Sequence, residues 1–176
     1  MKLLVIVDML NDFIDEKGAL FCGPTAREII EPIKRKLKEY RKNKNVIVFL
    51  QDAHKEDDLE FKRFPKHSVD GTWGSKIVSE LKPKKGEIIV KKKRYSGFYK
   101  TSLDGVLDFH NLMCQMIDEV EVVGVCTSIC VMDTVGGFAN RDYKVKVPKD
   151  CVADFDPEMH TFALKRMSSL YGADVS

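Results

Sequence analysis

The feature that most constrains the fold is a regular alternation of short apolar runs with longer amphipathic segments. The apolar runs predict buried strands at Leu3–Val7, Val46–Leu50, Glu87–Val90, Val120–Val125 and Lys144–Val147. The amphipathic segments predict helices at Pro24–Lys42, Ser75–Leu81, Ser102–Ile117, Cys130–Asn140 and Pro157–Leu170. Continuously apolar strands are typical of parallel sheets that helices cover on both faces. We therefore expect a three-layer α/β/α sandwich around a mainly parallel, doubly wound sheet of five to six strands, the last beginning at Ala173–Val175.

Length, charge and cysteine content narrow the class of protein. The 176 residues are expected to form a single domain, 1–176, with a core of its own. A net charge of +2, from 29 basic and 27 acidic residues, gives no reason to expect a nucleic-acid partner. No apolar run approaches the ~20 residues that span a membrane, and Asp8 interrupts the N-terminal run, which therefore predicts a strand and not a signal peptide. Five cysteines without a framework spacing predict reduced thiols in a cytoplasmic protein.

Polar side chains follow four of the predicted strands. Asp8 follows the first, Asp52 and His54 the second, a lysine run the third, and Cys126–Cys130 the fourth. Because ligands of open parallel sheets bind beyond the carboxyl ends of the strands, these groups are expected to lie at one edge and to form a site there.

The residue with the strongest chemical signal is Cys130. It lies where a strand turns into a helix, so the unpaired N–H groups and the dipole of the helix can stabilise a thiolate. Asp8, at a neighbouring strand end, is a candidate general base for the thiol proton. Cys126 and Cys130 lack the Cys-x-x-Cys spacing of dithiol redox proteins, and Cys22 and Cys114 are expected in a loop or the core.

A metal site is predicted beside this cysteine. Asp52 and His54 stand two apart, so in an extended chain they point to one side, and His67 can supply a third ligand. Two histidines and a carboxylate leave coordination positions open, as catalytic sites do. The lysine run offers a cation, but strand periodicity puts Lys92 on one face and Lys91 and Lys93 on the other without deciding which face looks into the site.

These residues resemble the isochorismatase-like cysteine hydrolases, and within them the nicotinamidases. The matching stretches, in the family's order, are Val7–Phe13, Gln51–His54, His67–Gly74, Lys92–Phe98 and Gly124–Val131. The resemblance implies a catalytic triad of Asp8, Lys92 and Cys130. It also implies a divalent metal ion at Asp52, His54 and His67, with Zn²⁺ first and Mn²⁺ or Fe²⁺ as alternatives, and a non-proline cis peptide between Val125 and Cys126.

The activity implied by the resemblance is hydrolysis of nicotinamide to nicotinate and ammonia through a thioester, a step of NAD salvage. The backbone N–H groups of Cys126 and Cys130 would hold the oxyanion. Phe13 and Phe64 are the candidates for the aromatic walls of the substrate pocket. The expected partner is then a small-molecule amide substrate, and neither a nucleic acid nor a membrane is expected to bind. Assembly into a homo-oligomer is left open.

Two departures from the nicotinamidase pattern keep alternatives open. Ser68 stands where a cysteine is frequent, and Ser128-Ile129 replaces an acidic-aromatic pair. Another small-amide hydrolase of the same fold, of the maleamate or ureidoacrylate amidase type, is the alternative enzyme. The alternative from a different class is a non-catalytic small-ligand-binding module, although no Gly-x-Gly-x-x-Gly follows the first strand.

Overall fold

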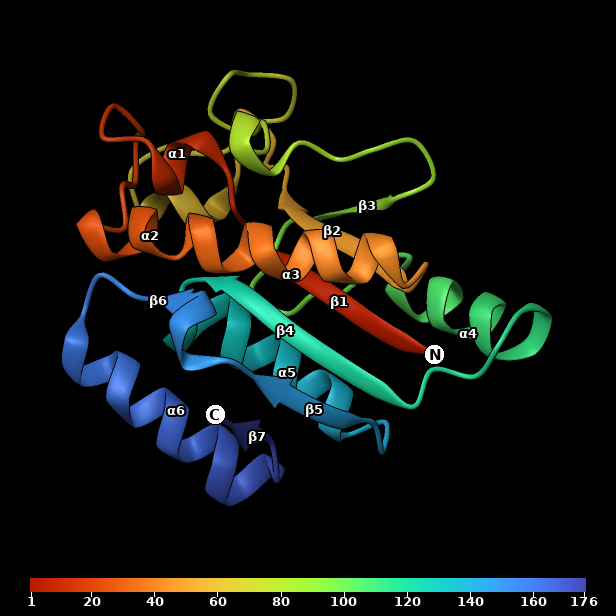
Figure 1. Cartoon of the computed structure of the whole chain (residues 1–176). Helices are drawn as coiled ribbons and strands as arrows, with labels where there is room; N and C mark the ends of the chain where they lie inside the picture. The colour runs from red at the N-terminus through yellow and green to blue at the C-terminus, as the bar shows by residue number, and fades with distance from the viewer.

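A computed structural model describes residues 1–176. Its centre is a seven-stranded sheet in which every paired strand is parallel, as predicted, although the strands outnumber the expected five to six. The spatial order is β3-β2-β1-β4-β5-β7, with the short β6 paired to β4 (Figure 1). The strands are β1 (Lys2–Val7), β2 (Val46–Asp52), β3 (Ile88–Lys92), β4 (Glu119–Val125), β5 (Lys144–Val147), β6 (Val152–Ala153) and β7 (Asp174–Val175).

Helices cover both faces of this sheet, which confirms the three layers. The longer helices are α3 (Ile30–Lys42), α4 (Leu103–Met113), α5 (Met132–Ala139) and α6 (Pro157–Tyr171); the shorter ones are α1 (Asn11–Ile14) and α2 (Pro24–Glu28). Alternate residues of β1 separate two cores. Leu4 and Ile6 pack with α3, whereas Leu3 and Val5 pack with α4 and α5.

Four helix predictions need correction. The segment 24–42 is two helices, because Pro32 has no N–H to donate to the carbonyl of Glu28. The segment 75–81 contains only a 3₁₀ turn, Ser79–Leu81, because the backbone at 76–78 pairs with residues 9–11. Helix α4 ends at Met113, four residues early, and the N–H of Ile117 donates to the side chain of Asn111. The segment 130–140 begins earlier, as a π-helical turn over Thr127–Val131.

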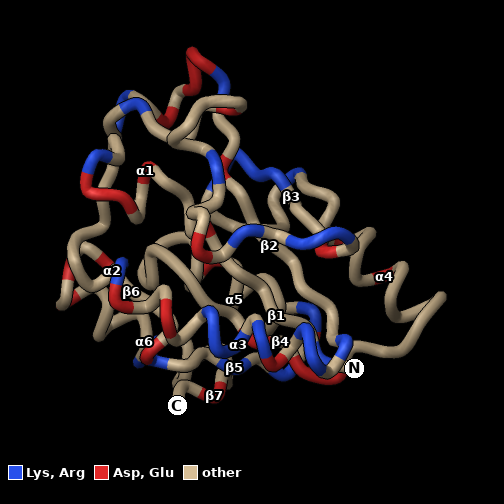
Figure 2. The backbone as a smooth tube through the Cα atoms, turned by 45° about the horizontal axis from the view of Figure 1, so that its top comes forward, with Lys and Arg blue, Asp and Glu red and all other residues tan.

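Charge is mixed over the surface. Basic and acidic residues both occur on α3 and on the loops at the top of Figure 2. None of the helices is both long and apolar enough to cross a membrane.

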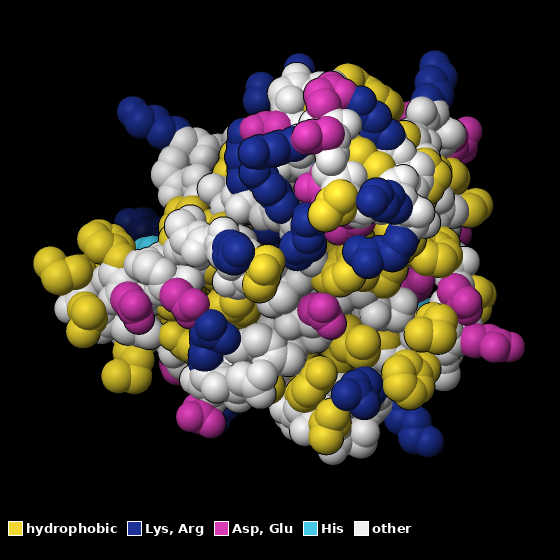
Figure 3. Space-filling view, turned by 180° about the vertical axis from the view of Figure 1, so that it is seen from behind, with side chains coloured by type: hydrophobic (Ala, Val, Ile, Leu, Met, Phe, Trp, Pro, Cys, Tyr) yellow, Lys and Arg dark blue, Asp and Glu magenta, His cyan; other side chains and the backbone are white.

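An exposed apolar cluster marks the end of α4, at the left of Figure 3. Its members are Phe109, Leu112, Met113 and Met116. Because the end of α4 leads into the start of β4, the cluster lies by the amino ends of the strands. The edge that carries the polar residues is the opposite one.

The order of the strands places a topological switch point between β1 and β4. From β1 the chain builds β2 and β3 on one side, and β4 and β5 follow on the other. In doubly wound sheets the ligand site lies outside the carboxyl ends of the strands at this point. Asp8 follows β1 and Cys126–Cys130 follow β4, so both predicted reactive groups come from the two strands that flank the switch point.

Candidate active site

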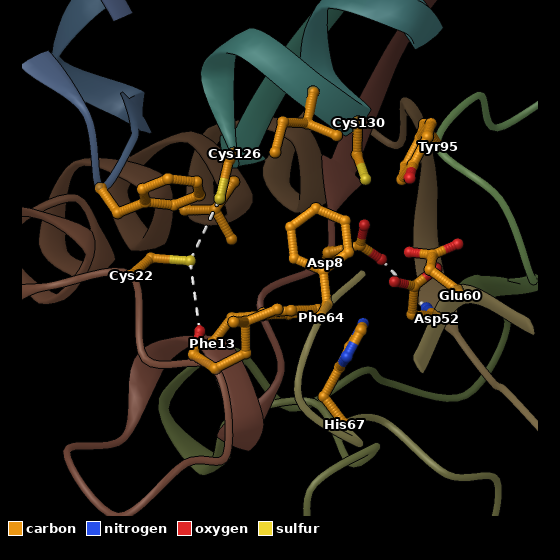
Figure 4. A pocket seen from close by; sticks show the side chains of 14 residues that line it. Asp8, Phe13, Cys22, Asp52, Glu60, Phe64, His67, Tyr95, Cys126 and Cys130 are labelled. Carbon is orange, nitrogen blue, oxygen red and sulfur yellow. Dashed lines mark hydrogen bonds between the residues drawn. The ribbon is translucent and has the colours of Figure 1, made fainter. Parts of the chain in front are cut away.

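A small cavity opens at the switch point (Figure 4). Mostly apolar and aromatic side chains line it, and the polar groups among them include Asp8, Asp52, His67 and Cys130. The structure thus brings predicted residues from the ends of β1, β2 and β4 to one cavity.

Asp8, Lys92 and Cys130 are in mutual contact beneath this cavity. The Lys92 Nζ lies 2.7 Å from Asp8 Oδ2 and 3.4 Å from Cys130 Sγ, and all three side chains are buried. The N–H of Asp52 donates to Asp8 Oδ1 at 3.0 Å, which orients the carboxylate. Asp8 has φ = +50°, a left-handed conformation that Asp adopts at less cost than most residues. The geometry therefore unites the triad that the family resemblance implies.

Strand register decides which lysine enters the site. Strands β2 and β3 each run two residues further than predicted, and Asp52 faces Lys92 across them. The Nζ of Lys92 is fully buried and donates to Asp52 Oδ1 at 2.6 Å. Lys91 instead points outwards and pairs with Asp70 at 2.6 Å. The choice that periodicity left open thus falls on Lys92.

Burial and neighbouring charges set the protonation of the three groups. Burial, together with the charge of Asp52, raises the pKa of Asp8 to about 7, although Lys92 lowers it in part. Burial also raises the pKa of the Cys130 thiol well above its usual value. For Lys92, burial alone would lower the pKa, but the carboxylates of Asp52 and Asp8 outweigh it and raise the pKa. Near neutral pH the site therefore holds an ammonium, a thiol and a carboxylate able to accept the thiol proton.

The backbone after β4 offers donors beside the thiol. The cis peptide between Val125 and Cys126 is present, as the resemblance implies. No protein group accepts the N–H of Cys126, whereas the N–H of Ser128 donates to Asp154 Oδ2 at 2.7 Å. Gly124 has φ = +116°, and a Cβ there would lie 2.1 Å from the carbonyl oxygen of Val7, so this position needs glycine. A free N–H at Cys126 suits an oxyanion hole.

Asp52, His54 and His67 form a group whose ligand atoms all lie within 4.8 Å of one another. The three residues are buried, and His54 Nε2 lies 3.5 Å from Asp52 Oδ2. The Nδ1–H of His67 donates to the carbonyl of Pro65 at 2.7 Å, which leaves its Nε2 with a free lone pair.

These three residues fit a divalent cation. His54 Nδ1 lies 3.2 Å from Asp58 Oδ2. The buried Nε2 of His54 has no hydrogen-bond partner, and an ion held with Asp52 would provide one. Two imidazoles and a carboxylate suit zinc and related metals. Asp52 therefore connects the two sets, with one oxygen on Lys92 and the other facing His54.

The predicted aromatic residues both line the cavity. The ring of Phe13 lies 5.4 Å from that of His67, and the ring of Phe64 lies 6.3 Å from it, between centroids. Figure 4 shows them beside His67 and across from Cys130.

Several residues of the site were not anticipated from the sequence. Glu60 is a buried acid in the cavity wall whose Oε2 has no hydrogen-bond partner, and burial raises its pKa. Tyr95 also lines the cavity, and Asp154 caps the turn that carries Cys130. Glu60 lies in a charged loop segment that, in sequence, looks like solvated surface. Cys22, predicted for a loop or the core, also belongs to the cavity wall.

The isochorismatase domain model matches residues 2–176. The chain belongs to the isochorismatase family. It is 35% identical over 185 aligned positions to the isochorismatase family protein PncA of Bacillus subtilis. That alignment covers 99% of this chain and 98% of the relative. The chain is also 27% identical to the ureidoacrylate amidohydrolase RutB of Yersinia enterocolitica, over 96% of this chain and 83% of that one.

Solved structures of the isochorismatase family share the fold. The B. subtilis nicotinamidase/pyrazinamidase PncA superposes with a TM-score of 0.90 at 34% identity, over 100% of both chains. The N-carbamoylsarcosine amidase of Thermoplasma acidophilum gives 0.87 at 34% identity, over 100% of this chain and 96% of that one. The pyrazinamidase of Pyrococcus horikoshii in complex with zinc gives a TM-score of 0.90 at 27% identity, over 99% of this chain and 98% of that one. The chain is thus an isochorismatase-family hydrolase, and the enzymes to which it is similar are named for different amide substrates.

Proposed function

We propose that this protein is a metal-containing nicotinamidase, which hydrolyses nicotinamide to nicotinate and ammonia. The observation that carries the proposal is the shared position of Asp52. One of its oxygens accepts from Lys92, beside Asp8 and Cys130, and the other faces His54 and His67, so a nucleophile and a metal-ligand set serve one small cavity. Similarity to nicotinamidases and to a zinc-bound pyrazinamidase supports it.

The reaction begins with proton transfer from Cys130 to Asp8 as the sulfur attacks the carboxamide carbon. Lys92, 3.4 Å from the sulfur, stabilises the negative charge that develops there. The carbonyl oxygen becomes an oxyanion, and the N–H groups of Cys126 and Cys130 donate to it. In acyl-transfer enzymes one such donor contributes about 3–4 kcal/mol to lowering the barrier.

Collapse of the intermediate expels ammonia and forms a thioester on Cys130. Asp8 gives the proton it took to the departing nitrogen. It then accepts a proton from the water that attacks the thioester, and returns this proton to the departing sulfur as nicotinate is released. Asp8 thus needs a pKa close to neutral, and its raised value near 7 suits both directions of transfer.

Asp52, His54 and His67 hold the divalent ion, which we propose to be Zn²⁺, with Mn²⁺ or Fe²⁺ as alternatives. When bound, the ion supplies a Lewis acid that orients a pyridine substrate through its ring nitrogen. Phe13 and Phe64 enclose the ring. The product would serve NAD salvage in the cytoplasm.

A second candidate is another small-amide hydrolase, because the chain is as similar to the N-carbamoylsarcosine amidase structure as to the nicotinamidase one, at 34% identity each. Ureidoacrylate and maleamate belong to the same group of candidate substrates. The metal-ligand set is what favours the pyridine amide over these acyclic ones.

Ammonia release decides between these candidates. We expect turnover of nicotinamide to exceed that of maleamate, ureidoacrylate and N-carbamoylsarcosine, with Zn²⁺, Mn²⁺ or Fe²⁺ supplied. Cys130→Ala should abolish it, whereas the matched change Cys114→Ala, at an exposed thiol, should leave it intact. Ammonia from an acyclic amide and none from nicotinamide would refute the substrate, and turnover by Cys130→Ala would refute the nucleophile.

A further inference from the structure

The thiol groups of two cysteines in the cavity wall take no part in the proposed reaction. Cys22 lies in the loop between α1 and α2, and Cys126 follows β4, 104 residues later. Their sulfur atoms are 3.1 Å apart, and both side chains are buried. Figure 4 shows the pair on the opposite side of the cavity from Asp52.

Hydrogen bonds hold the two sulfurs in this contact. The thiol of Cys22 donates to the carbonyl of Leu20 over 3.6 Å, so the thiol of Cys126 is the donor between the two sulfurs. The loop around Cys22 is itself anchored. The Cys22 N–H donates to the Phe13 carbonyl at 2.9 Å, and the Leu20 N–H donates to the Asp12 carbonyl at 3.0 Å. The anchored loop and the hydrogen bond from the Cys22 thiol to the Leu20 carbonyl therefore place the two thiols in contact.

We propose that Cys22 and Cys126 form a site of reversible oxidation, in which a hydroperoxide converts the two thiols to a disulfide and a dithiol reductant restores them. Both residues line the cavity proposed to admit the substrate, so its opening is the route by which a small oxidant would reach them. A disulfide bond requires the sulfurs to close from 3.1 Å to about 2.05 Å, a movement of about 1 Å.

The oxidation balances in two steps. One sulfur, on losing its proton, attacks an oxygen of the hydroperoxide, which forms a sulfenic acid and releases water or an alcohol. The second thiol attacks that sulfur, and the hydroxyl leaves as water with the thiol proton. The two thiols together lose two electrons and two protons, and the peroxide O–O bond accepts them.

The consequence for activity rests on the proposed function, in which the Cys126 N–H holds the oxyanion. Closing the sulfurs pulls on Cys126 on one side and on Phe13, through the Cys22 backbone, on the other. A displacement of about 1 Å in a catalytic constellation costs on the order of 10²-fold in rate. Because two side chains share the movement of about 1 Å between the sulfurs, the Cys126 N–H moves by less than that. We expect a loss in kcat/KM that is measurable but smaller than about 10²-fold, reversed by dithiothreitol.

The chemical test uses Cys130→Ala, which removes the competing nucleophile. After hydrogen peroxide treatment, alkylation in denaturant and digestion, we expect a peptide that links Cys22 to Cys126 and that disappears with dithiothreitol. Cys22→Ala in the same background is the control and should give no linked peptide. If Cys22 and Cys126 are both alkylated while the exposed Cys114 is oxidised, the proposal is overturned.

The activity test compares the chain with Cys130 intact to its Cys22→Ala variant, each normalised to its own untreated rate. Peroxide should cause a loss that dithiothreitol reverses, larger in the wild type than in the variant. Equal losses, with the linked peptide present in the wild type, would show that the disulfide does not control the reaction. If nicotinamide is not a substrate, the peptide result still stands, so the two proposals fail separately.

Discussion

Replacing Lys92 with methionine should destabilise the protein strongly. Methionine keeps the buried apolar stem but removes the charge that lies 2.6 Å from Asp52 and 2.7 Å from Asp8. Removing one partner of a buried ion pair costs about 3–5 kcal/mol, because the remaining charge has no counterion. Here two carboxylates remain, and protonation of Asp8, whose pKa is already raised to about 7, limits the loss. We therefore expect a decrease of about 3–5 kcal/mol in the free energy of unfolding.

The measurement is urea unfolding at about pH 8, where Asp8 is mostly ionised in the wild type, with chelator present so that no ion compensates Asp52. In the variant the pKa of Asp8 rises further, because Lys92 no longer lowers it. Lys91→Met is the matched control. It removes the neighbouring lysine, whose partner Asp70 is solvent-exposed, and should change stability by about 0.5 kcal/mol or less.

A double-mutant cycle tests the cause. Adding Asp8→Asn to Lys92→Met removes one of the two unpaired carboxylates, and the coupling energy should be about 2–3 kcal/mol. If Lys92→Met and Lys91→Met destabilise equally, or if the coupling is near zero, Lys92 does not neutralise these acids in the folded protein.

Three further predictions follow from particular contacts. Gly124→Ala should lower the free energy of unfolding by about 3 kcal/mol or more, because the methyl group meets the carbonyl of Val7 and φ is positive there. Gly105→Ala lies in α4, where a Cβ meets nothing within 4 Å, and should raise the free energy of unfolding by about 0.5–1 kcal/mol. Melting temperatures that shift in the same direction in both variants would contradict this reasoning. With nicotinamide as substrate, kcat/KM should fall about tenfold per pH unit below the Asp8 pKa of about 7, since the protonated acid cannot accept the thiol proton; a rate that is flat from about pH 5 to 7 would exclude Asp8 as the base. Elemental analysis of His54→Ala should show metal content well below that of the wild type, and a full complement would remove His54 from the ligand set.

The sequence alone was enough for the layers of the fold and for the edge that holds the site. Both depend on local patterns, since apolar runs identify buried strands and a polar residue at the end of each run marks one edge of the sheet. The errors fell where distant contacts override local preference. The segment 75–81, apolar enough for a helix, instead pairs its backbone with residues 9–11. The one strand that was not predicted, β6, has only two residues and is too short for a periodic signal, whereas β7 lies where the last strand was expected.

The candidate nucleophile could be proposed from sequence because its signal is local. Cys130 lies between an apolar strand and an amphipathic helix, and that junction by itself predicts a thiol at a helix N-terminus. The same holds for Asp8 and for the Asp52–His54 pair, which stand at strand ends. What these residues face could be expected only from the parallel order of the strands.

Tertiary structure decided what local patterns could not. Periodicity separated Lys92 from Lys91, but only the register that sets Asp52 opposite Lys92 shows which of them enters the site. Glu60, in a 3₁₀ turn at Leu59–Lys62, and Cys22, in the loop between α1 and α2, both line the cavity. Both segments are too short or too irregular for a periodic pattern to reveal this. The contact between Cys22 and Cys126 joins residues 104 positions apart, so it exists only once the loop has folded onto the end of β4. Sequence determines which side chains a strand end can offer, and packing determines which of them meet.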